Sequence, residues 1–151
     1  MIEFQSGSSN AVNSKAAILE CIDNAFADGN RADCTLLVIH STVGHSFAQM
    51  AAGAKEACPG AEIIGCTGSG VIGREGVSEA MRAMAVMAIT GDEFAVAATD
   101  GLNGANSAEL GERVAGEIKA ANPDINMMYI LSAGLDLSGD KVIEGIETVF
   151  G

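Results

Sequence analysis

The pattern of apolar residues in the first part of the chain predicts alternating strands and helices. Cys34–His40 and Ala61–Cys66 are almost continuously apolar, which is typical of strands covered on both faces. Apolar residues at helical spacing predict helices over Ala11–Ala27 and His45–Ala57, and Met1–Gln5 is expected to be a short strand. The resulting order β-α-β-α-β is typical of a sheet whose parallel strands are joined by crossover helices.

The pattern changes after Cys66. Thr67–Gly76 is a long glycine-rich turn with no helix directly after it. Val77–Ile89 contains helix-favouring Ala and Met residues, but its alternation also fits a strand. The turn residues Thr90–Glu93 favour the strand interpretation, because Phe94–Thr99 then completes a β-hairpin.

The last third of the chain predicts a further helix, strand and helix. Ser107 is a candidate N-cap for a helix with Leu110, Val114 and Ile118 on one face. Asn126–Ser132 is expected to be a buried strand. A final helix starts at Ser138, with inward-facing Val142, Ile143, Ile146 and Val149.

These elements predict one α/β domain over residues 1–151. We expect a layered sandwich with a mixed sheet, in which β-α-β-α-β is followed by a β-hairpin and by α-β-α. Apolar residues make up 48% of the chain and charged residues 19%, so a folded core is expected rather than a disordered chain.

The charge excludes two classes of partner. The formal net charge is -12, with only 8 Lys and Arg residues, whereas phosphate backbones and anionic membrane surfaces are bound by basic residues. The chain lacks both the run of roughly 20 apolar residues that a membrane helix needs and the features of a signal peptide. We therefore expect a cytoplasmic protein that binds neither nucleic acid nor membranes.

The four cysteines predict neither a zinc site nor a disulfide framework. Cys21, Cys34, Cys58 and Cys66 form no closely spaced ligand pair, and free thiols are the default in the cytosol. No metal or cofactor is therefore expected from their spacing.

The densest candidate site is the glycine-rich segment that follows the strand Ala61–Cys66. In α/β sheets, ligands bind where strands end, and glycines let the backbone approach a ligand closely. Two other loops are expected at the same edge of the sheet. The resulting candidate ligand-binding residues are Ser41, Thr42, His45, Cys66, Thr67, Gly68, Ser69, Gly70, Ser132 and Asp136.

Several of these residues have competing interpretations. Cys66 is a candidate nucleophile, but a thiol needs a nearby base or a positive environment to be activated. His40 and His45, the only histidines, are candidate metal or haem ligands. A packed thiol and hydrogen-bonded histidines are the simpler alternatives. Asp136 is either a ligand contact or a helix-capping, solvated residue.

The segment from Pro59 through Gly73 to the Gly76-Val77-Ser78 step resembles the FIST N-terminal domain. In that family a "PGA-x-IIGC-S/T" strand leads into a turn of small residues and then into a "G-V-S" strand. The resemblance covers about Ala32 to Phe150, including Met128-Tyr129-Ile130-Leu131. The chain departs from the family at Gly68-Ser69-Gly70, where members usually have an acidic turn.

The resemblance implies a sensory domain of a signal-transduction system rather than an enzyme. It implies a small-molecule ligand such as an amino acid, a downstream signalling protein as partner, and an N-terminal fragment or a short member of the family. The alternatives are a haem-binding nitric oxide sensor and a thiol-dependent enzyme using Cys66. A truncated sheet would also leave an edge strand on which the chain could form a homodimer.

Overall fold

The computed structural model describes residues 1–132 and 134–151. These residues divide into two compact units, Met1–Asp92 and Glu93–Gly151. The first unit contains the β-sheet and two helices, and the second contains two further helices. The α/β class and the mixed sheet predicted from the sequence are therefore confirmed, while the prediction of a single domain over residues 1–151 stays a prediction.

A four-stranded mixed sheet forms the centre of the fully described first unit. Its strand order is β1 (Glu3–Ser9), β6 (Met84–Thr90), β2 (Cys34–Thr42) and β3 (Glu62–Gly68). β2 and β3 are parallel, whereas β6 is antiparallel to both of its neighbours, β1 and β2. The predicted order β-α-β-α-β is confirmed, and β6 is inserted between β1 and β2.

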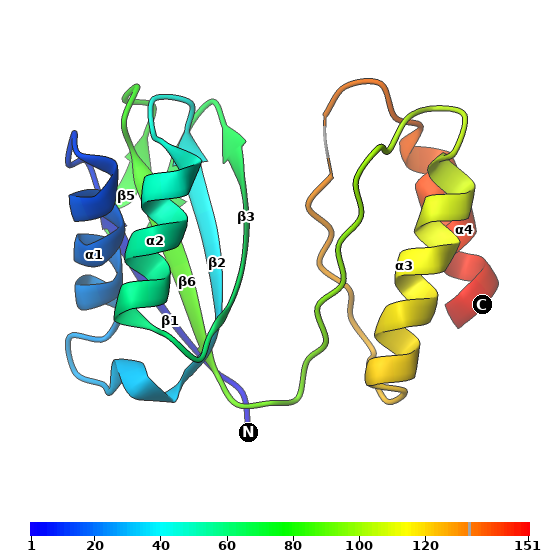
Figure 1. The fold of residues 1–151 in the computed structure, drawn as a ribbon, viewed down its shortest axis with the longest axis horizontal. Helices are drawn as coiled ribbons and strands as arrows, with labels where there is room; N and C mark the ends of the chain where they lie inside the picture. Colours follow the sequence, from blue (N-terminus) through cyan, green and yellow to red (C-terminus); the bar gives the residue numbers. More distant parts are fainter. Residues whose placement is uncertain (133) are drawn as a thin grey trace. The chain divides into compact units, whose positions relative to one another are not determined.

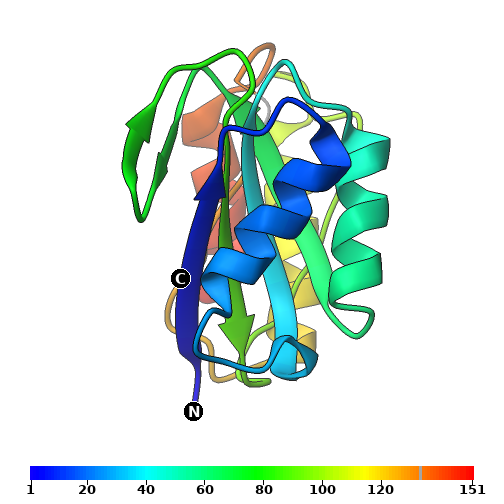
Figure 2. The same cartoon turned by 90° about the vertical axis from the view of Figure 1, so that its left-hand side faces the viewer.

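Helices α1 (Ser14–Ala25) and α2 (Phe47–Ala57) pack side by side against one face of this sheet (Figure 1; Figure 2). The buried residues of α1 recur every three or four positions, which gives the helix one apolar face. Ile18 and Ile22 of this face join Leu37 and Ile39 of β2 in the core. The sheet and its two helices thus form a two-layer unit.

The start of α1 is defined by a side-chain cap. The Asn13 side chain accepts a hydrogen bond from the backbone N–H of Ala16 at 2.9 Å. Gly7 of β1 permits the close packing of this helix on the sheet, because a Cβ at Gly7 would lie 2.7 Å from the backbone nitrogen of Ala25. α1 therefore begins at Ser14, three residues after the predicted start at Ala11.

The single strand predicted over Val77–Ile89 is wrong. Residues 76–78 form β5 (Gly76–Ser78), which pairs with β4 (Val71–Gly73) in a separate two-stranded sheet. The chain then bends at residues 79–83 before β6 begins at Met84. The alternation of apolar residues continues through the bend, so the pattern alone does not reveal it.

The hairpin predicted between residues 77–89 and Phe94–Thr99 is also absent from the structure. Residues 93–100 contain no assigned strand. β6 already pairs with β1 on one side and with β2 on the other, so it has no free edge for Phe94–Thr99. The hairpin of the structure is β4–β5 instead.

The second unit is built on two closely packed helices, α3 (Ser107–Ala121) and α4 (Gly139–Phe150). Ser107 is buried and joins their first turns, since its hydroxyl donates to the Asn103 carbonyl at 2.6 Å and accepts from the Ser138 N–H at 3.1 Å. Asn106, not Ser107, is the N-cap residue of α3, whereas Ser138 precedes α4 as predicted.

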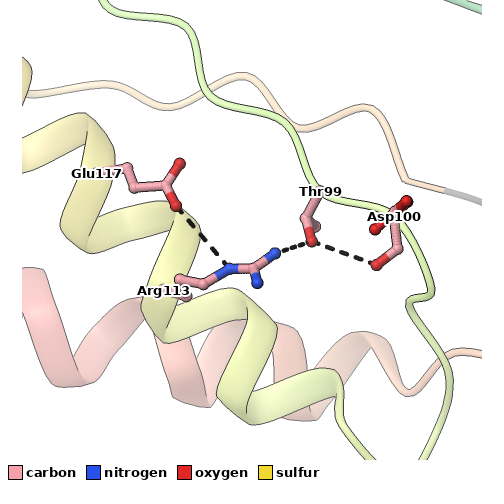
Figure 3. Close-up of polar contacts among 4 residues, drawn as sticks. All are labelled: Thr99, Asp100, Arg113 and Glu117. Atoms are coloured by element: carbon pink, nitrogen blue, oxygen red, sulfur yellow. Dashed lines mark hydrogen bonds and ion pairs between the residues drawn. The ribbon is translucent and has the colours of Figure 1, made fainter.

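One hydrogen bond attaches the segment before α3 to that helix, and an ion pair and a second hydrogen bond extend the cluster on either side of it (Figure 3). Arg113 pairs with Glu117 one turn later at 3.9 Å and donates to the Thr99 hydroxyl. Thr99 in turn donates to the Asp100 carbonyl at 3.3 Å. All of these groups belong to the second unit, so they fix its internal arrangement.

The strand predicted over Asn126–Ser132 is not formed. No strand is assigned within the described residues of the second unit, so this run has no strand partner there. Its side chains are partly exposed, Met127 at 79% and Tyr129 at 56%. In α4, Val142 is buried as predicted, but Ile143 is 46% exposed. None of the described helices is long and apolar enough to cross a membrane.

Candidate functional site

The carboxyl ends of β2 and β3 lie side by side at one edge of the sheet. Their parallel register places His40 beside Cys66, Ser41 beside Thr67 and Thr42 beside Gly68. The structure therefore brings the two predicted loops of the first unit together, as expected for adjacent parallel strands.

His40 and Cys66 form a direct side-chain contact at this edge. The Cys66 Sγ atom lies 3.4 Å from the His40 Nδ1 atom, and both residues are half-buried. Each residue was a predicted candidate, but their contact was not predicted. The signal was present, because the two residues stand at matching positions near the ends of neighbouring strands.

The other three thiols are buried. Burial raises the pKa of Cys21 and of Cys34 to about 12, and it also raises the pKa of Cys58. The Cys34 thiol hydrogen-bonds to the Leu36 carbonyl at 3.6 Å. Cys66 is thus the one cysteine of the chain that is not buried, and it is also the one beside a histidine.

The glycine-rich segment after Cys66 is open to solvent. Thr67, Gly68, Ser69 and Gly70 are all exposed. A Cβ at Gly68 would approach only the backbone of Gly70, at 3.2 Å and beyond. A Cβ at Gly70, by contrast, would lie 3.0 Å from the Ser78 carbonyl oxygen, so the bend is open at Gly68 and packed at Gly70.

Ser41 and Thr42 are buried at 1% and 2% exposure, although they were predicted as ligand contacts. The Thr42 hydroxyl donates to the Met81 carbonyl at 2.7 Å and accepts from the Ala83 N–H at 2.9 Å, so it joins β2 to the chain before β6. The buried Ser41 Oγ has no hydrogen-bond partner among the described atoms. Neither hydroxyl is exposed to a ligand in this conformation.

His45 is also buried, at 7% exposure. Its Nδ1 atom lies 3.3 Å from the Ser14 hydroxyl oxygen, which also accepts from the Ser46 N–H at 3.0 Å. Burial lowers the pKa of His45, and the positive charge of Arg82 lowers it further. His45 thus acts as a neutral anchor between the starts of α1 and α2, and its Nε2 has no partner among the described atoms.

Ser132 and Asp136 belong to the second unit. Both are exposed, and Asp136 has a backbone φ of 62° in the loop before α4. Ser138, not Asp136, stands at the N-cap of that helix. Their participation in a site with residues of the first unit stays a prediction.

An open depression elsewhere in the first unit was not predicted. Its volume is about 420 Å³. It lies beside residues 4–6 of β1, which align through β6 with residues 36–38 of β2, so it is away from the carboxyl ends of β2 and β3. Gln5 lines it, and the Oε1 atom of Gln5 is buried without a partner among the described atoms. The remaining lining residues are Phe4, Ser6, Ala25, Ala27, Asp28, Gly29 and Arg74.

No group of three or more His, Cys, Asp or Glu residues suited to a metal ion occurs among the described residues. Residues 35–151 match the family model of the FIST N domain. A search of curated proteins gives no match.

Proposed function

The chain belongs to the FIST N domain family, and we propose that it binds a small molecule at the carboxyl ends of β2 and β3. The FIST domain is a sensory domain of signal-transduction proteins. The observation that carries the proposal is the exposed segment Thr67–Gly70, which lies beside the end of β2 and next to the His40–Cys66 contact.

The chemistry of this edge suits a small polar metabolite. Gly68 is exposed and has no side chain to cover its backbone, and backbone N–H groups can donate to a carboxylate. His40 and Cys66 add one imidazole and one thiol, both half-buried. An amino acid or a similar metabolite fits this combination.

We further propose that the domain binds its ligand without turnover and transmits the signal to a downstream protein. The chain has 20 Asp and Glu residues against 8 Lys and Arg residues, so few cations are present to stabilise an anionic transition state. Its four cysteines are free, which suits the reducing cytosol as the proposed location. β1 and β3 are the edge strands of the sheet, and we further propose that a second copy of the chain can pair with one of them to form a homodimer.

A thermal-shift screen with amino acids and small organic acids tests the proposed binding. A ligand at a hundredfold excess over its Kd stabilises the folded state by about 2.7 kcal/mol, which raises Tm by about 5–10 °C for a chain of this size. Gly68→Trp should abolish the shift by filling the ligand end of β3. Gly60→Trp is the matched control, because it introduces the same side chain before the other end of β3, where a Cβ meets nothing within 4 Å.

Two results would count against the proposal. One is the absence of a shift with every compound in the screen. The other is a shift that Gly68→Trp retains, which would place the ligand away from the strand ends.

Haem binding is a second candidate, and the structure favours one histidine for it. His45 is 7% exposed and is held by Ser14, so its ring is not available without rearrangement. His40 is half-buried at the strand end and is the better placed axial ligand. Bound haem would supply an iron that takes up a gas such as nitric oxide. A Soret band that His40→Ala removes and His45→Ala keeps would favour this candidate.

A further inference from the structure

We propose that Cys66 is a reactive thiol, paired with His40, that forms a mixed disulfide with a low-molecular-weight disulfide. This would make Cys66 a modification site, separate from the non-covalent ligand binding proposed above.

Cys66 is accessible to a small reagent in solution. Among the four cysteines, Cys66 alone is not buried. The residues that follow it, Thr67–Gly70, are exposed, so a small disulfide can approach along the strand end. A reagent in solution should therefore distinguish Cys66 from the other three thiols.

His40 is positioned to act as the base for Cys66. The His40 Nδ1 atom lies 3.4 Å from Sγ, within hydrogen-bond range for sulfur. A thiol reacts as its thiolate, and an adjacent imidazole is the usual group that takes the thiol proton. The parallel register of β2 and β3 holds the two side chains together on regular strands, which gives the contact a defined geometry.

The exchange reaction is balanced in atoms and electrons. His40 Nδ1 takes the proton from Sγ, and Sγ attacks one sulfur of the small disulfide. The Cys66–sulfur bond forms as the original S–S bond breaks, and the leaving thiolate takes up a proton. The Cys66 sulfur rises from the thiol to the disulfide oxidation level as the leaving sulfur falls from the disulfide to the thiol level, so the products are one mixed disulfide and one free small thiol.

The mixed disulfide at Cys66 has no suitable resolving thiol within the chain. A mixed disulfide is resolved when a second thiol attacks it. Cys21, Cys34 and Cys58 are buried, and burial raises the pKa of each. None of them is suited to resolve the adduct, so the modification should persist until an external thiol reduces it. A persistent, reversible adduct beside the strand ends would report the surrounding thiol–disulfide balance.

The test is the rate of labelling of the full chain by oxidised glutathione, followed by intact mass and by peptide mapping. We expect a single adduct at Cys66, formed at least about tenfold faster than on a free cysteine model at the same pH. Cys66→Ser should abolish the adduct, and dithiothreitol should release it.

Variants of His40 separate proton transfer from packing. His40→Asn keeps a hydrogen-bond acceptor but no proton-accepting nitrogen, so the rate should fall by about tenfold. Added imidazole should restore part of the rate in His40→Ala and leave the wild type unchanged. Ile72→Ala, at an exposed position of β4 outside the proposed site, should label like the wild type.

Three results would overturn the proposal. They are a wild-type rate no faster than that of free cysteine, equal rates in the wild type and His40→Asn, and labelling spread over the buried cysteines of the folded protein. The free-cysteine comparison needs no variant, so it holds even if a His40 variant fails to fold. A failure here leaves the thermal-shift test of ligand binding unaffected.

Discussion

The two histidines near the end of β2 differ in burial and in contacts, and the sequence alone does not predict this difference. His40 is half-buried and contacts Cys66, whereas His45 is buried and lies against Ser14. Both histidines flank the same loop, and either can be a ligand by residue type alone. Their different roles follow from which face of the chain each side chain occupies, so only His40 is suited to meet a small molecule directly.

The burial of His45 predicts a pH-dependent stability. The pKa of His45 is lowered in the folded protein, so between that value and the ordinary value of 6.5 only the unfolded chain binds the proton. The contribution of His45 to the free energy of unfolding should therefore be complete above pH 6.5 and should decrease as the pH falls below that value. Urea denaturation at pH 7.5 and at pH 5.5 measures this loss.

The control for this experiment is His45→Asn. The variant should lower stability at pH 7.5 but show a smaller change between the two pH values, since the group that takes up the proton is gone. An equal pH dependence in the variant and the wild type would show that other groups cause it.

At the scale of elements, small residues decide how closely the helices approach. Gly145 of α4 faces the Ala108 carbonyl of α3, and Gly111 of α3 faces the Val142 carbonyl of α4. A side chain at either position would meet backbone atoms, which cannot rotate away. The two glycines thus allow α3 and α4 to pack backbone against backbone.

Gly145→Ala should destabilise this helix pair. The new Cβ would collide with the Ala108 carbonyl and lie 2.8 Å from the Glu112 nitrogen, so we expect a loss of about 1–3 kcal/mol. Gly116→Ala is the matched control within α3, because its Cβ meets nothing within 4 Å, and it should stabilise by about 0.4–1 kcal/mol. Far-UV circular dichroism during urea denaturation measures both changes. Equal effects of the two substitutions would contradict the close packing.

Most helices and central strands could be predicted at this scale, because their periodicity is local. β2, β3, α1, α2 and both later helices lie within a few residues of the predicted bounds. The failures share one cause. Phe94–Thr99 and Asn126–Ser132 have strand-like composition, but a strand also needs a partner edge, which is a non-local condition.

At the scale of the whole molecule, the position of β6 decides the architecture of the first unit. β6 follows β3 in the chain but pairs between β1 and β2, where it blocks the predicted hairpin. Nothing in the local pattern specifies that insertion. The register of β2 and β3 does follow from their adjacency, so the strand-end site could be predicted in outline. The contact of His40 with Cys66 was not predicted, although their matching positions in the two strands indicated it.

The location of the proposed ligand can be measured by amide chemical shifts. The full chain, labelled with ¹⁵N, would be titrated with the metabolite that raises Tm most. We predict shift changes that saturate together at residues 66–70 of the glycine-rich segment and at residues 40–42 of β2. Changes centred instead on the depression lined by Gln5 and Arg74, with the strand ends unmoved, would contradict a site at the ends of β2 and β3.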